Sequence, residues 1–131
     1  MRLLLIFTAL TSALSVAVAE DYPTRPVNII VPAAAGGPTD TISRITAQAM
    51  SKILGQQITI ENAGGAGGTI GTARVVRAEP DGYTLLIYHV GLATAATLYR
   101  KLPYETRTAF APIGLVTGRA DDDYRSIGLC A

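Results

Sequence analysis

The order of apolar and polar positions in the first third of the chain predicts a strand, a loop and a helix. Residues 27–31 (VNIIV) form a short run rich in β-branched side chains that ends at Pro32, which is typical of a strand. A glycine loop follows, and Pro38 suits the first turn of a helix because its missing N–H needs no partner there. The helix is predicted to end at Gly55. Its apolar side chains, at helical spacing, are Ile42, Ile45, Ala49, Met50 and Ile53.

The same order then repeats. Residues 57–61 are predicted to form a second strand, residues 63–68 a second glycine loop and residues 69–78 a second helix. The apolar residues on one side of this helix are Ile70, Ala73 and Val76. Residues 83–88 are nearly all apolar, as expected for a central strand that is covered on both faces.

Beyond residue 91 the pattern is weaker and predicts a helical turn over residues 95–100 and a fourth strand over residues 110–116. Strands that alternate with helices indicate an α/β fold with a mostly parallel sheet flanked by helices. Right-handed crossovers would bring both glycine loops to the carboxyl edge of the sheet. Ligands of open α/β sheets bind at that edge.

Residues 1–19 have the pattern of a secretory signal peptide. Arg2 is followed by an apolar run over residues 3–14, and Ala17-Val18-Ala19 predicts cleavage before Glu20. The alternative is an uncleaved membrane anchor, although the run is short for a hydrocarbon layer of about 30 Å. The sequence therefore predicts export from the cytoplasm.

Composition narrows the range of functions. Without residues 1–19 the chain has 112 residues, ten of them basic and ten acidic, and offers no cluster of Lys and Arg for a nucleic acid. This length is enough for one modest core. Cys130 is the only cysteine and His89 the only histidine, so neither an internal disulfide nor a four-ligand metal site is expected.

The two glycine loops are the best candidates for a site. Glycines let a backbone approach a ligand closely, and each loop leads into a helix N-terminus, where free N–H groups and the helix dipole favour an anion. Two such loops side by side would hold a carboxylate or phosphate without Lys or Arg. The alternative is that the glycines only make tight connections between strand and helix.

Four side chains near the loops have two interpretations each. Asp40, at the third position of the predicted helix, either accepts N–H groups at the helix start or holds a ligand ammonium or a water. Thr39 and Thr69 either donate hydroxyls to an anion or cap their helices. His89, at the end of the third strand, either faces the ligand or is a polar residue at the rim.

The sequence shows no catalytic triad, paired carboxylates or nucleophile elbow, so neither catalysis nor a cofactor is expected. A dinucleotide-binding enzyme domain remains an alternative because Gly65, Gly67 and Gly71 lie between a strand and a helix. No acidic residue ends the next strand, where the ribose partner would be expected.

Five ordered stretches within residues 22–116 resemble the solute receptors of tripartite tricarboxylate transporters, the Bug-type (TctC-like) periplasmic binding proteins of bacteria. They are YPTRP with IIVPAAAGGPTD, then ITIENAGGAGGTIG, AEPDGYTLL, LYRKLPYE and FAPIGLV. The resemblance implies a periplasmic-binding-protein type II-like fold whose two lobes close on a small carboxylate. Tricarboxylates, dicarboxylates and acidic amino acids are the implied ligands, and membrane transport subunits the implied partners.

In that family, backbone amides and hydroxyls of the two glycine loops hold the ligand carboxylate. This chain departs from the family pattern at Ala63-Gly64, where an Arg-Pro pair is usual, and at residues 91–96. The candidate ligand-binding residues are those of the two glycine loops and the histidine after the third strand: Ala35, Gly36, Gly37, Thr39, Asp40, Ala66, Gly67, Gly68, Thr69 and His89.

The domain organisation expected from this resemblance is partial. Residues 1–19 are the predicted signal peptide, residues 20–118 part of the N-terminal lobe (domain 1), and residues 119–131 a divergent tail whose Asp121-Asp122-Asp123 run suits solvent. The expected function is a truncated periplasmic receptor for small carboxylates. A non-functional fragment of such a receptor is the alternative.

Overall fold

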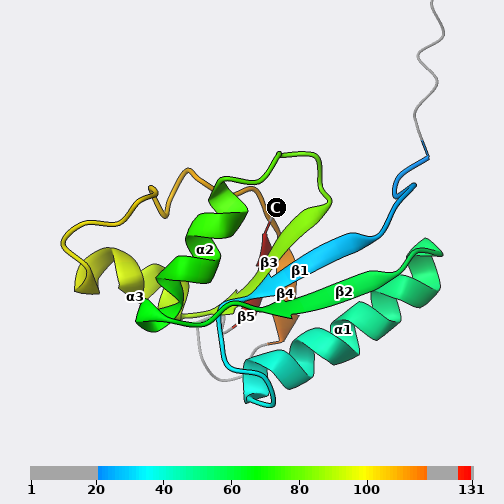
Figure 1. Ribbon diagram of the computed structural model, residues 1–131, viewed down its shortest axis with the longest axis horizontal. Coiled ribbons are helices and arrows are strands. Elements are labelled where there is room, and N and C mark those ends of the chain that lie inside the picture. The colour runs from blue at the N-terminus through cyan, green and yellow to red at the C-terminus, as the bar shows by residue number, and fades with distance from the viewer. Residues whose placement is uncertain (1–20, 118–126, 131) are drawn as a thin grey trace, which may run out of the picture.

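The computed structural model describes residues 21–117 and 127–130 of the chain (Figure 1). The predicted signal peptide and the Asp121-Asp122-Asp123 run lie outside these residues. Within the described ranges, no helix is both long enough and apolar enough to cross a membrane.

The described strands form one mixed sheet in the order β2-β1-β3-β5-β4. β1 pairs in parallel with β2 and with β3, whereas β5 runs antiparallel to both β3 and β4. The prediction of a mostly parallel sheet flanked by helices is therefore confirmed. The bounds are β1 (Val27–Val31), β2 (Ile58–Asn62), β3 (Thr84–His89), β4 (Pro112–Thr117) and β5 (Ile127–Cys130).

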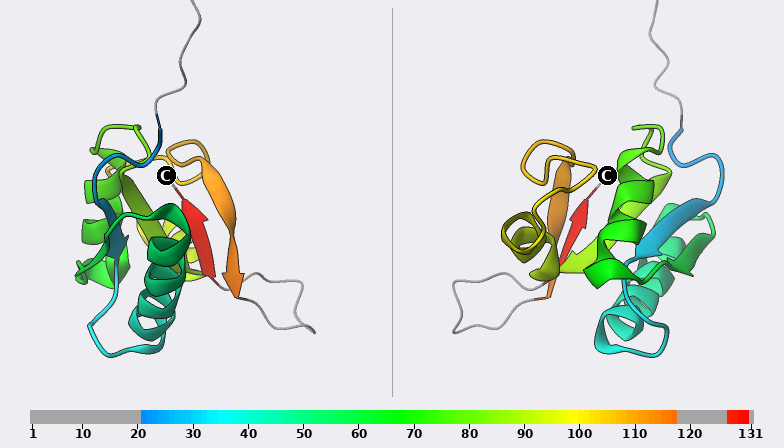
Figure 2. Two further views of the ribbon diagram at one scale, coloured as in Figure 1. Left: turned by 90° about the vertical axis from the view of Figure 1, so that its right-hand side faces the viewer. Right: turned by 60° about the vertical axis from the view of Figure 1, so that its left-hand side comes forward.

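Helices cover both faces of the sheet (Figures 1 and 2). α1 (Pro38–Leu54) packs on one face against β1, β2 and β3. α2 (Thr69–Val76), preceded by the 3₁₀ turn η1 (Ala66–Gly68), packs on the other face with α3 (Gly91–Leu98). α3 begins four residues earlier than the sequence pattern predicts.

The core consists of two apolar clusters, one on each face, because successive side chains of a strand point to opposite sides. Val27, Ile29 and Val31 of β1 pack toward α1 with Ala47. Ile30, between them in the sequence, packs toward α2 with Val75, Leu86 and Tyr88. β1 and β3 are covered on both faces, which explains their almost unbroken apolar sequence.

The apolar residues at helical spacing do not all face the sheet. Ile42 and Met50 pack against the core. Ile45 and Ile53 of α1 are 64% and 83% exposed, and Ile70 of α2 is 54% exposed, so these three do not face the core although they share its helical spacing.

Small side chains take the places of these isoleucines against the sheet. Ser43 and Ala47 are the α1 residues buried deepest in its middle turns, and Thr72 is fully buried in α2. The hydroxyls of Ser43 and Thr72 donate to the carbonyls of Thr39 and Gly68, four residues earlier, at 2.7 and 2.8 Å. Polar groups satisfied within their own helix let the helix approach the sheet closely.

β5 lies in the segment that the sequence interpretation assigned to a divergent tail. Residues 127–130 nevertheless pair with β3 on one side and β4 on the other, so they belong to the sheet (Figure 2). A four-residue strand that is inserted out of sequence order has no periodicity long enough to reveal it.

The first described residues are fastened at the amino edge of the sheet. The Tyr22 hydroxyl donates to the Gly82 carbonyl at 2.6 Å. Arg25 pairs with Asp81 at 2.6 Å and stacks over the Tyr83 ring at 3.9 Å. These contacts tie the chain before β1 to the turn before β3, opposite the edge at which those strands end.

Candidate functional site

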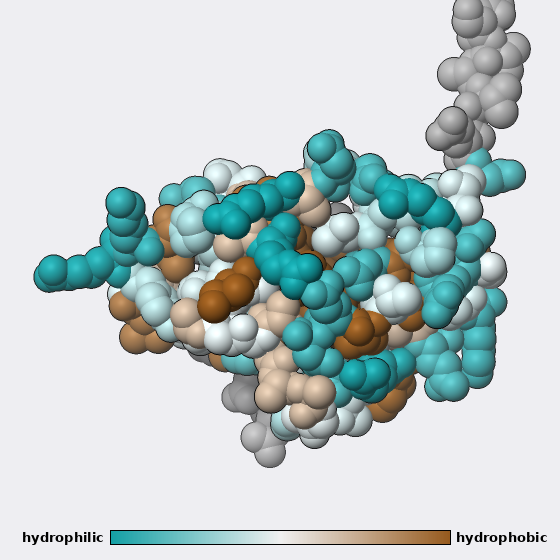
Figure 3. Space-filling model, viewed as in Figure 1, coloured by the Kyte–Doolittle hydropathy of each residue, from teal (hydrophilic) through white to brown (hydrophobic). Residues whose placement is uncertain are grey.

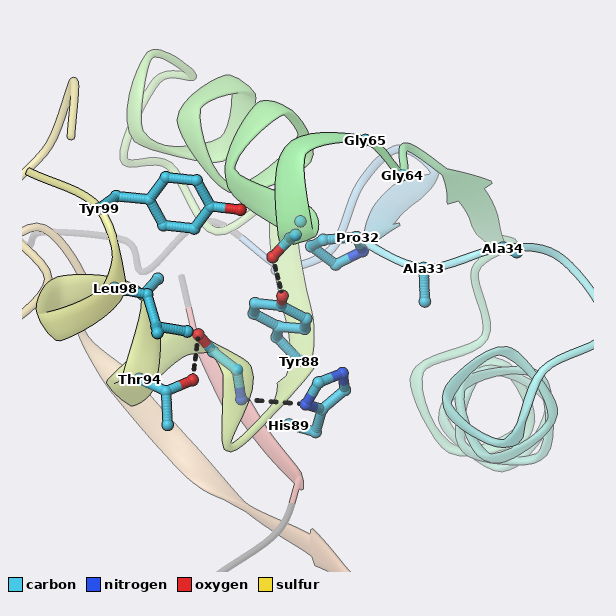
Figure 4. A pocket seen from close by; sticks show the side chains of 14 residues that line it. Pro32, Ala33, Ala34, Gly64, Gly65, Tyr88, His89, Thr94, Leu98 and Tyr99 are labelled. Atoms are coloured by element: carbon cyan, nitrogen blue, oxygen red, sulfur yellow. Dashed lines mark hydrogen bonds between the residues drawn. The ribbon is translucent and has the colours of Figure 1, made fainter. Parts of the chain in front are cut away.

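A pocket of about 450 Å³ opens at the carboxyl edge of the sheet (Figure 4). β1, β2 and β3 are parallel and end at Val31, Asn62 and His89. The segments that follow these ends therefore meet at one place. The pocket is lined by Pro32, Ala33, Ala34, Gly64, Gly65, Gly67, Gly68, Tyr88, His89, Gly91, Thr94, Ala95, Leu98 and Tyr99.

The second glycine loop has a backbone that ordinary residues rarely adopt. Gly65, Gly67 and Gly68 have φ values of 109°, 60° and 87°, and Ala66 between them has a φ of 46°. Four successive residues at positive φ turn the chain sharply into α2. Glycine is the residue that tolerates such angles without steric cost.

Tyr88 fills the space that these glycines leave open. Its side chain is 6% exposed, and its hydroxyl donates to the carbonyl of Gly67. A Cβ atom on Gly68 would collide with the Tyr88 hydroxyl, and one on Gly91 would lie 2.8 Å from it. Burial raises the pKa of Tyr88 above its usual value of 10.0, so the phenol stays protonated as a donor.

Two other polar side chains of the pocket are held by neighbouring backbone. His89 Nδ1 accepts the N–H of Gly91 at 3.0 Å, and the Thr94 hydroxyl donates to the Gly91 carbonyl at 3.3 Å. The Tyr99 hydroxyl lies 2.5 Å from the position that a Cβ on Gly67 would occupy. It has no hydrogen-bond partner among the described residues, so it is available to a ligand.

Backbone donors are also available at the pocket. The amides of Ala34, Gly64 and Gly65 donate to no partner within residues 21–117 and 127–130. The first turn of α2 contains no acidic residue, and no side chain caps it. An anion at the second glycine loop would therefore meet unpaired donors and the positive end of a helix dipole.

The first glycine loop is occupied by a carboxylate of the chain itself. Asp40 is 2% exposed, and its Oδ2 accepts the N–H of Gly36 at 2.8 Å and Arg44 Nε at 3.0 Å. Its Oδ1 accepts Asn62 Nδ2 at 3.0 Å. The hydrogen bond from Arg44, followed by those from Gly36 and Asn62, lowers the pKa of Asp40 from 3.8 to about 2.

The two loops therefore differ in what they offer. Asp40 already supplies the anion at the N-terminus of α1 and would repel another anion there. No acidic residue has this role at α2. Of the two interpretations of Asp40, the geometry favours the one in which it accepts backbone and side-chain donors of its own chain.

The predicted site residues separate into two groups. Gly67, Gly68 and His89 line the pocket. The other seven do not line it. Among them, Asp40 accepts the hydrogen bonds described above, and the Thr69 hydroxyl donates to the Ala66 carbonyl at 2.9 Å. Thr39 is buried. The seven are Ala35, Gly36, Gly37, Thr39, Asp40, Ala66 and Thr69.

The sequence interpretation missed most of the pocket wall. Ala33 and Ala34, directly after β1, contribute the first loop's share of the lining, and Gly64 and Gly65 extend the second loop's share. Tyr88 and Tyr99 are the aromatic residues of the pocket. Their signal in the sequence was position: one precedes the end of β3 and the other follows α3, both at the edge where a ligand was expected.

The family model for "Tripartite tricarboxylate transporter family receptor" (TctC) matches residues 42–120, more than half of the chain. This chain belongs to that family. The TctC family consists of solute-binding receptors and not of enzymes, which removes the dinucleotide-binding alternative.

Individual relatives agree with this assignment. A UPF0065 protein of Agrobacterium vitis is 58% identical over 103 residues, which are 78% of this chain and 30% of the relative. The periplasmic binding protein BugD is 56% identical with a TM-score of 0.70, over 72% of this chain and 31% of BugD. MatC from Rhodopseudomonas palustris, solved with bound malate, is 46% identical with a TM-score of 0.70, over 72% of this chain and 33% of MatC. The TctC-family chain described here thus spans about a third of the length of these relatives.

Replacing Gly68 tests how tightly Tyr88 packs against the second glycine loop. Gly68→Ala is expected to destabilise this TctC-family chain more than Gly55→Ala. Both glycines have positive φ, 87° and 67°, so the backbone strain of about 1–2 kcal/mol is common to both variants. The added Cβ meets Tyr88 in the first and open space in the second, which adds about 1–3 kcal/mol to the first loss alone.

Urea unfolding of the two variants measures the difference. Equal losses of unfolding free energy would show that Tyr88 yields to the new side chain, and the close packing described above would then be incorrect.

The carboxyl group of Asp40 is expected to titrate with a midpoint near pH 2. Because its pKa is lowered on folding, the stability that it contributes is present above about pH 4 and is lost as the pH falls toward 2. Carboxyl ¹³C shifts recorded against pH give the midpoint. Arg44→Gln should raise it toward 3.8, since Arg44 is the largest cause of the shift.

The matched control is Arg74→Gln, which removes the partner of Glu61 on the other side of β2. This variant should leave the Asp40 midpoint unchanged. A titration midpoint of Asp40 near pH 3.8 in the unmodified chain would contradict the hydrogen bonds described for its carboxylate.

Proposed function

We propose that this chain is part of a periplasmic solute receptor that binds a small carboxylate and presents it to the membrane subunits of a tripartite tricarboxylate transporter. The observation that carries the proposal is the second glycine loop, where unpaired backbone amides and the start of α2 border a pocket. Bound malate in MatC, a structural relative, supports a carboxylate as the ligand.

Recognition by backbone amides suits a carboxylate. Amides and a helix N-terminus supply partial positive charge at fixed positions, and they hold an anion without a lysine or arginine. In this chain the donors of Ala34, Gly64 and Gly65 come from two loops that the parallel strands place side by side. Each carboxylate oxygen has lone pairs for two hydrogen bonds, so one group can use several such donors.

The single lobe limits the affinity. Binding proteins of this kind exclude water by closing two lobes over the ligand. The described residues form a sheet with one open pocket edge, so a ligand here keeps much of its surface in water. We therefore expect dissociation constants on the order of 1 mM, corresponding to about 4 kcal/mol.

Titration with malate, followed by NMR of the backbone amides, tests the proposal. The amide resonances of Gly64, Gly65 and Gly67 are expected to shift as malate is added. Gly55 and Gly114 lie outside the pocket and serve as internal controls. A folded chain whose pocket glycines do not respond to malate or to other small carboxylates at tens of millimolar would contradict the proposal and favour a non-functional fragment.

Export is the second part of the proposal. The relative BugD is a periplasmic binding protein, and residues 1–19 have the sequence of a signal peptide. Bacteria that express the full chain should contain, in their periplasmic extract, a form that begins at Glu20. Mass spectrometry of that extract measures the terminus. Ala19→Arg should block processing because signal peptidase requires a small residue there, and a mature form of unchanged mass in this variant would refute the predicted cleavage site.

A further inference from the structure

We propose that the free edge of β2, together with the groove between β2 and α1, is a docking surface for an extended acidic segment of a partner protein. A groove of about 410 Å³ lies between these two elements, and Figure 1 shows α1 lying along β2. Arg44, Ala47 and Lys52 line it from α1, and Ile58 and Ile60 line it from β2. None of its lining residues borders the pocket at the glycine loops, so this inference does not depend on the proposed function.

β2 is the first strand in the order of the described sheet, so β1 is its only neighbour there. The carbonyl of Gln57 accepts the N–H of Val27 at 3.0 Å, and the N–H of Ala63 donates to the Val31 carbonyl at 2.9 Å. Alternate residues of a parallel strand bond to the same neighbour, so the odd-numbered residues of β2 bond to β1. The N–H and C=O groups of the even-numbered residues, which include Ile60, therefore point away from the sheet and can pair with an added strand.

Basic side chains lie at both ends of this groove. Arg44 Nη2 donates to Asn62 Oδ1 at 3.2 Å, at the end of β2. The Ser51 hydroxyl donates to the Gln56 carbonyl at 2.7 Å, just before the start of β2, which places Lys52 at that end. The Lys52 ammonium is exposed and has no partner within the described residues, and none of the described residues that line the groove is Asp or Glu. In Figure 3, which has the view of Figure 1, hydrophilic surface borders apolar surface over α1 and β2.

The spacing of the two cations fits an extended peptide. Arg44 and Lys52 are eight residues apart in α1, which is about 12 Å along the helix axis. Residues four apart in a strand are about 13 Å apart and point to the same face. A strand added beside β2 would therefore place one carboxylate at each cation and an apolar side chain midway, against Ala47 and Ile60. Arg44 has donors for this contact, because its hydrogen bonds to Asp40 and to the end of β2 use two of its five N–H groups.

The charges favour a different protein over a second copy of this chain. A two-fold axis beside β2 would pair this strand with its own copy, since such an interface uses the same patch on both chains. Each chain would then bring its Arg44 and Lys52 to a groove that already contains two cations. Like charges that face each other across paired strands are destabilising.

Two synthetic heptapeptides of one composition test the proposal. Acetyl-TETVTET-amide has two glutamates on the same face of a strand as its valine, whereas acetyl-TTEVETT-amide has them on the opposite face. In the second peptide the glutamates would meet Thr59 and Glu61, whose side chains contact Asn28 and Arg74 on the other face of the sheet. We expect the first peptide to bind at least about fivefold more tightly, the value for two exposed ion pairs. NMR titration measures both affinities.

Amide hydrogen exchange distinguishes strand addition from the attraction of charges alone. Bound TETVTET peptide should slow the exchange of the outward-pointing amides of Ile58 and Ile60, and the amide of Thr59, which already bonds to β1, is the internal reference. Binding without this protection, equal affinity of the two peptides, or no binding of TETVTET at millimolar concentration would each overturn the proposal. Protection that grows with protein concentration in the absence of peptide would overturn it in favour of a second copy.

The two lysines of the chain provide matched variants. Lys52→Glu reverses the charge at one end of the groove, at an exposed position, and should weaken the binding of TETVTET about fivefold. Lys101→Glu makes the same change at an exposed lysine outside the groove and should leave the affinity within about twofold of the unmodified chain. Equal losses in the two variants would indicate a response to net charge alone and would refute the docking surface.

Discussion

The contact between Tyr88 and the second glycine loop is the constraint on which the site depends. Tyr88 belongs to the central strand β3, and its hydroxyl donates to the Gly67 carbonyl. Its ring occupies the volume that side chains at Gly68 and Gly91 would need. One rigid side chain thereby links the end of β3, the start of α2 and the start of α3. The second glycine loop can keep its unusual φ values because the Tyr88 side chain packs against it and holds it in place.

The two glycine loops look alike in sequence but have different roles in the structure. The first is closed by Asp40, whose carboxylate joins α1 to the end of β2 through Arg44 and Asn62. The second has no internal anion, and the amides of Gly64 and Gly65 have no partner within the described residues. The first loop would then act as a fixed support for the second. The N-terminus of α1 already has its anion in Asp40, so its electrostatic environment would not change if an anion bound at the second loop.

The sequence was sufficient to predict most helices and strands and the sheet edge at which the pocket lies. It was not sufficient to predict which residues line that pocket. β1 and the start of α1 follow from local chemistry: a β-branched run, a proline at the helix start and a left-handed glycine at its end. The inward face of α1 could not be predicted because Ser43 and Ala47, not Ile45 and Ile53, fit the distance between helix and sheet. The role of Asp40, in α1, could not be predicted because its partner Asn62 lies at the end of β2, far from it in the sequence. Tyr99 lines the pocket because α3 packs beside η1 and β3, and that contact between elements is not encoded in a local sequence pattern.

The contacts of Tyr22 and Arg25 with the turn at residues 81–83 hold the segment before β1 in place. These contacts lie at the amino edge of β1 and β3, whereas the pocket lies at their carboxyl edge (Figure 1). Tyr22 and Arg25 therefore lie at the edge of the sheet away from the pocket. A surface-immobilising tag attached at this edge would leave the pocket open to solution, which makes this edge the natural attachment point for binding measurements on an immobilised lobe.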